Sequence, residues 1–153
     1  MKKFNIHVAS CDQMINDVSQ LVKVPNTDVA VISIGCPGRV QPLFDINVLS
    51  TLYLDFDDID SRTPCDDTKY ILFNKDMAKE IFKFVDWCVE NSKKELLICV
   101  HCDAGISRSP AVALALIKIY NKAKTMPIEW NLYNRHVYSI MMNEFHGNRV
   151  KFV

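Results

Sequence analysis

The order of apolar and polar positions along the chain predicts four β-strands. Residues 29–34 and 96–100 are short, almost continuous apolar runs, as expected of strands that are buried on both faces of a sheet. In residues 4–9 and 48–56 the apolar side chains recur at every second position, which predicts strands with one buried face. Strands buried on both faces are typical of parallel sheets that helices cover.

Segments with helical periodicity separate these strands. Apolar residues recur three and four positions apart in residues 11–22 and 74–91, and Asn74 is a suitable N-cap for the second of these helices. Residues 111–117 are good helix formers without a polar face, so we expect a helix buried in the middle of the domain. A last amphipathic helix begins near Asn134.

The alternation of strands and helices predicts an α/β fold: a central, mostly parallel sheet of about four to five strands with helices on both faces. The chain has 153 residues, of which 49% are hydrophobic. This length suffices for one compact domain over residues 1–153 and is too short for two. The longest wholly apolar run, residues 111–117, is far shorter than a membrane span, so no membrane partner is expected.

Candidate chemistry lies in the segment HCDAGISRSP, which begins at His101 and ends at Pro110. It joins a predicted buried strand to a predicted buried helix. The free backbone N–H groups at the N-terminus of a helix, together with the helix dipole, favour an anion. We therefore expect phosphate or another oxyanion to bind in this loop.

Five residues make this loop a candidate reaction site. Cys102 lies beside a helix N-terminus and an arginine, where we expect a nucleophilic thiolate at neutral pH. Arg108 offers a planar, permanently charged fork for two phosphate oxygens. Gly105 lets successive N–H groups converge, Ser109 can donate to the leaving sulfur, and His101 is expected to orient the loop through its ring N–H groups.

This segment resembles the H-C-x5-R-S signature of the cysteine-dependent protein phosphatases, most closely their dual-specificity and tyrosine-specific branch. The close match covers about a dozen residues, and a looser resemblance extends from Asp58 to Ile119. It implies the cysteine-phosphatase fold and hydrolysis through a phosphocysteine intermediate, with no metal ion or organic cofactor. By the same resemblance, the phosphate-binding residues are Asp103, Ala104, Gly105, Ile106, Ser107 and Arg108.

Other functions use similar residues. Cys99 and Cys102 form a C-x-x-C pair, which is found in redox and zinc sites, but no second pair exists and Cys99 lies inside a predicted strand. A phosphopeptide-binding module without turnover, a rhodanese-like enzyme and an arsenate-reducing enzyme could all use the same loop. Noncatalytic relatives usually lack the nucleophile, whereas Cys102 is present here.

Hydrolysis of a phosphate ester also needs an acid that protonates the leaving oxygen. No aspartate follows Asp103, so we look for the acid upstream, in the stretch DFDDID that begins at Asp55. Strand alternation places Asp58 on the side of the buried residues, and Asp57 is the alternate. Asp58 lies further from the nucleophile than is usual in the dual-specificity family, and residues 59–70 form a candidate movable flap.

The five residues between Cys102 and Arg108 include no lysine or arginine. Relatives that act on phosphoinositides or on RNA 5′-phosphates often have extra positive charge near the loop, so a phosphoprotein is the expected substrate. Phosphotyrosine and phosphoserine or phosphothreonine both remain open, as do the two nonprotein substrates.

The charge and the cysteines agree with this interpretation. Eighteen basic and eighteen acidic residues cancel, so bulk charge does not indicate a nucleic-acid partner. Six cysteines, one of them an expected thiolate, favour a cytoplasmic location over a disulfide-linked secreted fold. The turn at residues 35–38 could approach the site, but we favour its interpretation as an ordinary connection.

Overall fold

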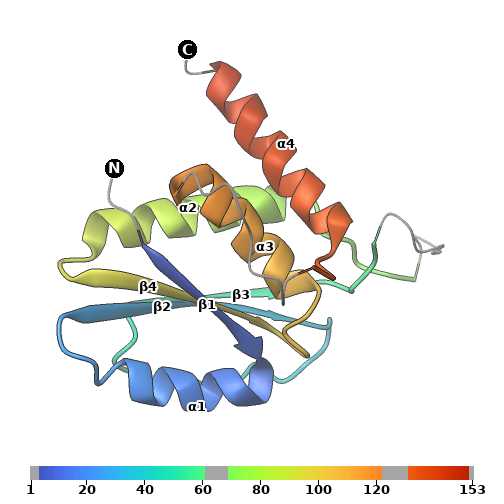
Figure 1. The fold of residues 1–153 in the computed structure, drawn as a ribbon. Coiled ribbons are helices and arrows are strands. Elements are labelled where there is room, and N and C mark those ends of the chain that lie inside the picture. The colour runs from blue at the N-terminus through green and yellow to red at the C-terminus, as the bar shows by residue number, and fades with distance from the viewer. Residues whose placement is uncertain (1–3, 61–68, 122–130, 152–153) are drawn as a thin grey trace.

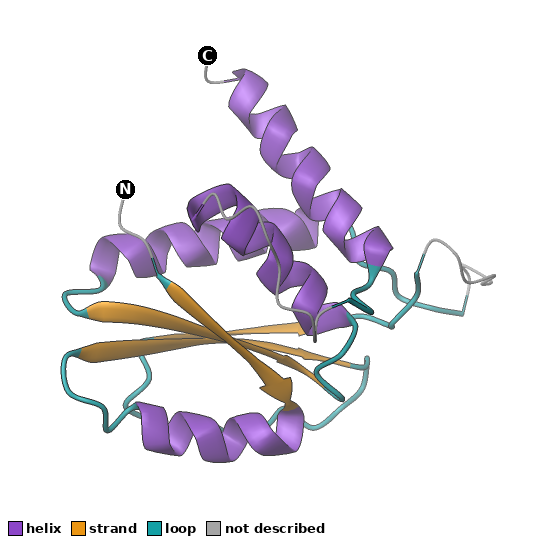
Figure 2. Cartoon of the chain, in the orientation of Figure 1, coloured by secondary structure: helices purple, strands orange, loops and turns teal. Residues whose placement is uncertain are grey.

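The computed structural model describes residues 4–60, 69–121 and 131–151, with side chains up to residue 147. Most of the candidate flap, residues 61–68, lies outside them. Within the described residues, one all-parallel sheet has the order β1-β4-β2-β3. Figure 2 shows this sheet in orange with helices in purple on both of its faces. Its strands are β1 (Asn5–Ser10), β2 (Thr27–Gly35), β3 (Ser50–Asp55) and β4 (Glu95–Cys102).

Helices cover both faces of this sheet, which confirms the predicted α/β architecture. α1 lies against one face, α2 and α3 lie against the other, and α4 packs on the outside of α2 and α3 (Figure 1). Among the described helices, none combines the length and the apolar character needed to cross a membrane. The helices are α1 (Cys11–Leu21), α2 (Lys75–Asn91), α3 (Arg108–Leu116), which continues as the π-helix η1 (Ile117–Asn121), and α4 (Arg135–Lys151).

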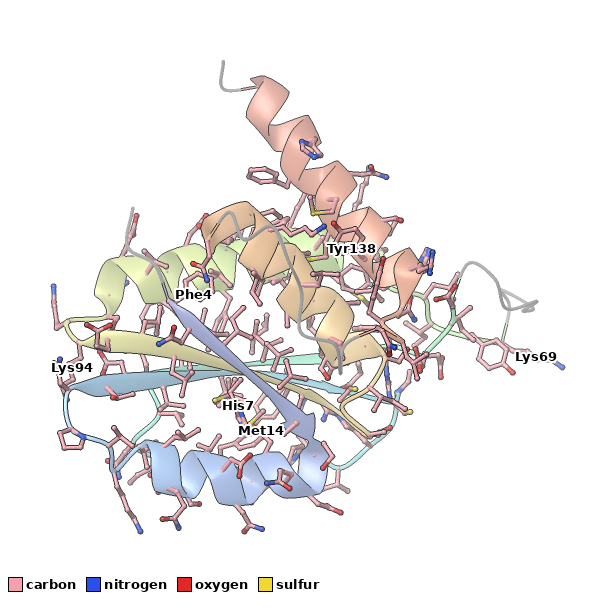
Figure 3. All side chains as sticks on the ribbon, in the orientation of Figure 1. Phe4, His7, Met14, Lys69, Lys94 and Tyr138 are labelled. Atoms are coloured by element: carbon pink, nitrogen blue, oxygen red, sulfur yellow. The ribbon has the colours of Figure 1, made fainter. Side chains whose placement is uncertain are left out.

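Alternation along the central strands divides the core into two layers. Val29 and Val31 of β2 are buried against α1, where Met14 lies between that helix and the sheet (Figure 3). Ala30 and Ile32 point to the opposite face and join the larger cluster under α2 and α3. Both layers are apolar, which explains why β2 reads as a continuous apolar run in the sequence.

Two of the predicted boundaries that differ from the structure have a local explanation. β3 begins at Ser50 rather than at residue 48, because Val48 belongs to a turn in which its N–H donates to the Asp45 carbonyl at 3.3 Å. α3 begins at Arg108 rather than at residue 111. Proline is tolerated in the first turn of a helix, where its missing N–H has no intrahelical partner, so Pro110 does not delay the start of α3.

At the carboxyl ends of the strands, the neighbouring strands β1 and β4 continue into helices on opposite faces of the sheet. Ser10 at the end of β1 is in register with Cys102 at the end of β4. β1 leads into α1 on one face, whereas β4 leads into α3 on the other (Figure 1). In parallel α/β sheets, ligands bind in the crevice that such a divergence opens at the carboxyl ends of the strands.

The N-cap of α2 can be tested by stability. The Asn74 side chain accepts a hydrogen bond from the Met77 N–H at 3.0 Å. Asn74→Ala should lower the free energy of unfolding by about 1 kcal/mol, because it leaves a helix donor without its partner. Asn74→Ser should retain most of the stability. Urea unfolding of the three proteins measures this, and equal midpoints would show that the cap contributes nothing.

Candidate active site

The loop between β4 and α3 wraps around the sulfur of Cys102. Cys102 is the last residue of β4 and is 2% exposed. Its Sγ accepts a hydrogen bond from the Gly105 N–H at 3.3 Å and lies 3.1 Å from the Ser109 hydroxyl. Both groups can donate to a thiolate, so the loop is built to hold a negatively charged sulfur.

The shape of the loop requires glycine at position 105. Gly105 has φ +75°, and a Cβ atom there would lie 2.6 Å from the carbonyl carbon of Ala9 and 2.7 Å from the Ser10 nitrogen. The loop therefore rests directly on the backbone at the end of β1. This close approach turns the Gly105 N–H toward the sulfur, and a side chain at this position would displace the loop.

Arg108 is buried beneath the same loop. It is 4% exposed; Nη1 donates to the Phe56 carbonyl at 2.8 Å, and Nη2 donates to Asp103 Oδ2 at 3.0 Å. Its Nε is buried and has no hydrogen-bond partner among the described residues. Burial acts to lower the pKa of Arg108, but the negative charge of Cys102 and the hydrogen bond to Asp103 outweigh it and raise that pKa.

The favoured interpretation of residues 35–38 as an ordinary connection was wrong, and the alternative that this turn approaches the site agrees with the contacts of Cys36. The Cys36 thiol donates to Asp103 Oδ2 at 3.3 Å, and Cys36 Sγ lies 3.8 Å from Arg108 Nη1. Parallel pairing brings the end of β2 to the same edge as the end of β4, which the local sequence does not reveal. Partial burial acts to raise the pKa of Asp103, but the hydrogen bonds from Cys36 and Arg108 and the charge of Arg108 prevail and lower it.

His101 is held by a chain of hydrogen bonds that crosses the sheet. Nδ1 lies 3.0 Å from the Cys102 carbonyl, which can only accept, so Nδ1 carries the proton. Burial lowers the pKa of His101, and the neutral ring then accepts from Ser33 through Nε2 at 2.6 Å. Ser33 in turn accepts from Arg39 at 3.1 Å. One ring N–H, rather than two, therefore fixes the backbone beside the nucleophile.

The structure brings Asp58, and not Asp57, to the phosphate loop. Asp58 Oδ1 accepts hydrogen bonds from the Ser107 hydroxyl and from the Asn134 amide, both at 2.8 Å. Asp57 instead pairs with Ile71, whose N–H donates to Asp57 Oδ2 at 2.8 Å. The two candidate acids therefore have different surroundings. Asp58 is hydrogen-bonded to the phosphate loop, whereas Asp57 is hydrogen-bonded to the backbone at Ile71.

Sequence reasoning missed Asn134 and Arg39 as site residues. Asn134 was recognised only as the opening of the last helix, and nothing in its neighbourhood pointed to Asp58. Arg39 donates to Asp55 at 2.8 Å and to the Ser33 carbonyl at 2.9 Å. Its side chain passes over Gly35, where a Cβ atom would lie 2.2 Å from Arg39 Cδ. Glycine at position 35 was the available signal, and it was interpreted only as part of a turn.

The C-x-x-C pair is divided between the two faces of the sheet. Cys99 packs in the layer under α1, whereas Cys102 belongs to the opposite cluster. Burial raises the pKa of Cys99 to about 12, so this thiol stays protonated. Among the described residues, no group of histidine, cysteine and acidic side chains could hold a metal ion.

The loop residues predicted to bind phosphate run from Asp103 to Ser107 in the bend that follows β4, and the last of them, Arg108, is the first residue of α3. Ser109, Pro110 and the rest of α3 are buried, so the helix N-terminus is directed at the loop from the interior. The side chain of Asp103 is 59% exposed and that of Arg108 is 5% exposed. The loop therefore presents backbone N–H groups and one buried cation beside the sulfur.

Two of the solved structures that are similar to the chain are the following. The human tyrosine phosphatase-like serine/threonine/tyrosine-interacting protein matches over 97% of this chain and 94% of that chain, with 14% sequence identity and a TM-score of 0.58. The active form of Tk-PTP matches over 94% of this chain and 80% of that chain, with 14% identity and a TM-score of 0.46. No family model matches the sequence, and no curated protein matches it. The first likeness confirms the expected phosphatase-type fold.

Two alanine variants can separate the effect of the close contact between Gly105 and β1 from the effect of its positive φ. Gly105→Ala should lower the free energy of unfolding more than Gly38→Ala does. Both residues have positive φ, but a Cβ atom at position 38 would meet nothing within 4 Å. Gly38→Ala should therefore cost only the left-handed conformation, about 1–2 kcal/mol. Chemical denaturation of both variants gives the comparison, and equal losses would mean that the loop can move away from Ala9.

Proposed function

We propose that the protein hydrolyses phosphate monoesters on proteins through a phosphocysteine intermediate at Cys102. The observation that carries the proposal is the combination of a sulfur that Gly105 and Ser109 both contact with a buried guanidinium at its side. The buried Arg108 Nε has no described partner, and a buried donor without an acceptor is costly unless a ligand completes it. A phosphate oxygen would supply that acceptor.

In the first step the Cys102 thiolate attacks phosphorus and the bond from phosphorus to the leaving oxygen breaks. Asp58 gives its proton to that oxygen, so the alcohol or phenol departs neutral. The loop N–H groups and Arg108 stabilise the charge on the three equatorial oxygens. In the second step these roles are reversed. Water attacks phosphorus, the Asp58 carboxylate takes a proton from that water, and the bond between sulfur and phosphorus breaks. The regenerated Cys102 thiolate is stabilised by a hydrogen bond from the Ser109 hydroxyl.

The composition of the loop favours a phosphoprotein over a polyanionic substrate. Residues 103–107 contain one acid and no base, and the Asp103 carboxylate is exposed beside the phosphate position. Additional phosphates on an inositol ring or an RNA end would be repelled by this charge. Ile106 is 52% exposed and offers an apolar contact at the edge of the loop, which suits a peptide better than a sugar phosphate.

Two observations favour a second candidate, a phosphopeptide-binding module without turnover. The solved structure with the TM-score of 0.58 is named a phosphatase-like interacting protein. In addition, Arg108 Nη2 donates a hydrogen bond to Asp103, so fewer guanidinium N–H groups are left to bind the oxygens of a transition state. A protein of this kind would bind a phosphopeptide and leave it intact, so turnover assays on the wild-type protein distinguish the two functions.

The nucleophile is tested by Cys102→Ser. This variant should fold and still bind phosphopeptide but lose turnover of p-nitrophenyl phosphate, because a serine hydroxyl is not ionised at neutral pH. Cys11→Ser makes the same atomic exchange at a cysteine outside the loop and should retain activity. Steady-state rates together with a thermal unfolding curve measure this. Turnover by folded Cys102→Ser at the wild-type rate would exclude the phosphocysteine mechanism.

The acid is tested by leaving-group dependence. Asp58→Asn should slow phenyl phosphate by about 10²- to 10⁴-fold and p-nitrophenyl phosphate far less, since a good leaving group needs little protonation. Asp57→Asn should slow neither ester, because Asp57 is bound to Ile71. The opposite pattern in the two variants would exchange their roles.

A further inference from the structure

We infer that Ser107 and Asn134 are positioning residues that hold the Asp58 carboxyl in the orientation from which it protonates the leaving group. This inference rests on the function proposed above, since it concerns the acid of that reaction. It assigns a task to two side chains that lie outside the nucleophile and its arginine. Each of these two residues directly precedes a helix: Ser107 precedes α3 and Asn134 precedes α4.

Ser107 does not use its hydroxyl as the caps of the other helices do. Ser10 and Asn74 each accept a hydrogen bond from a backbone N–H in the first turn of α1 and α2. Ser107 occupies the same position at α3, but its side chain makes no capping bond. Its hydroxyl donates instead to Asp58 Oδ1 at 2.8 Å, across 49 residues of sequence. The side chain therefore serves Asp58 rather than the helix.

Asn134 is completely buried and every polar group of its side chain is used. Its Oδ1 accepts from the Val137 N–H at 3.0 Å and so caps α4. Its Nδ2 donates to Asp58 Oδ1 at 2.8 Å and to the Ile59 carbonyl at 3.2 Å. Because Val137 supplies a donor and Ile59 an acceptor, the amide can take only this orientation. Its backbone N–H donates to the Ser107 carbonyl at 2.9 Å, which joins the two positioning residues.

Three consecutive residues, 58–60, are therefore hydrogen-bonded to residues at the N-terminus of α4. Besides the bonds to Asp58 and Ile59, the Arg135 N–H donates to Asp60 Oδ2 at 2.9 Å. Carboxylates are stabilised at the N-terminal end of a helix by its free N–H groups and its dipole. Since Asn134 also binds the phosphate loop through Ser107, α4 sets the distance between the acid and the loop.

This arrangement determines which oxygen of Asp58 can carry the proton. Oδ1 accepts from two donors, so a proton on Oδ1 would meet two other hydrogens. No described residue donates to Oδ2, so Oδ2 is the oxygen left to carry the proton that goes to the leaving group. Loss of either donor would let the carboxyl group rotate. Misplacement of a reacting group by about 1 Å can cost up to about 100-fold in rate.

The experiment measures kcat/KM for phenyl phosphate and p-nitrophenyl phosphate in three variants. Ser107→Ala and Asn134→Ser should slow phenyl phosphate by about 10- to 100-fold and p-nitrophenyl phosphate much less. Ser107→Thr keeps the hydroxyl and should stay near wild type. Asn134→Ser keeps an N-cap acceptor for Val137 while removing both donors, so α4 is retained. Thermal unfolding identifies any variant that does not fold, and the other variant then decides.

A double-mutant cycle with Asp58→Asn separates positioning from a general effect on the loop. If Ser107 acts through Asp58, Ser107→Ala should have no further effect in the Asp58→Asn background. An equal loss in both backgrounds, or an equal loss on both esters, would overturn the inference and leave the proposed function intact. Failure of the wild-type protein to turn over either ester would instead overturn the proposed function, and the inference with it.

Discussion

A buried guanidinium connects the parts of this structure that are far apart in sequence. Removing a charge from water costs several kcal/mol even after relaxation, so Arg108 at 4% exposure needs good partners. It finds them in the Phe56 carbonyl at the end of β3 and in the Asp103 carboxylate of its own loop. The bond to Phe56 spans 52 residues. The loop can therefore take its shape only after β2, β3 and β4 have paired.

The parallel sheet explains why one edge of the molecule contains every candidate site residue. All four strands end there, and each contributes something different. The end of β1 supports Gly105 from below, and the chain after β2 brings Cys36 to Asp103. The chain after β3 brings Asp58 to Ser107. No single segment contains the whole site. The residues that form it lie at the ends of the strands or within a few residues after them.

The charge balance at this edge is local rather than global. The chain as a whole is neutral, yet Arg39 and Arg108 are each committed to a carboxylate and a backbone carbonyl. Their partners Asp55 and Asp103 keep these cations in place before any anion binds. Among the described residues, the buried Arg108 Nε has no hydrogen-bond partner, so it keeps donor capacity for an anion. An anion with one phosphate group matches that capacity.

The sequence by itself determined the strand, loop and helix around Cys102, because the buried runs on either side and the spacing from Cys102 to Arg108 and Ser109 are local features. It also placed Asp58 on the side of Phe56, although β3 ends at Asp55, so strand alternation does not account for the contact with Ser107. Tertiary structure decided the partners of Asp58, of Cys36 and of His101. These hydrogen bonds join residues 49 to 76 positions apart. Periodicity reports which face of an element is buried, whereas a contact near 3 Å depends on how separate elements pack.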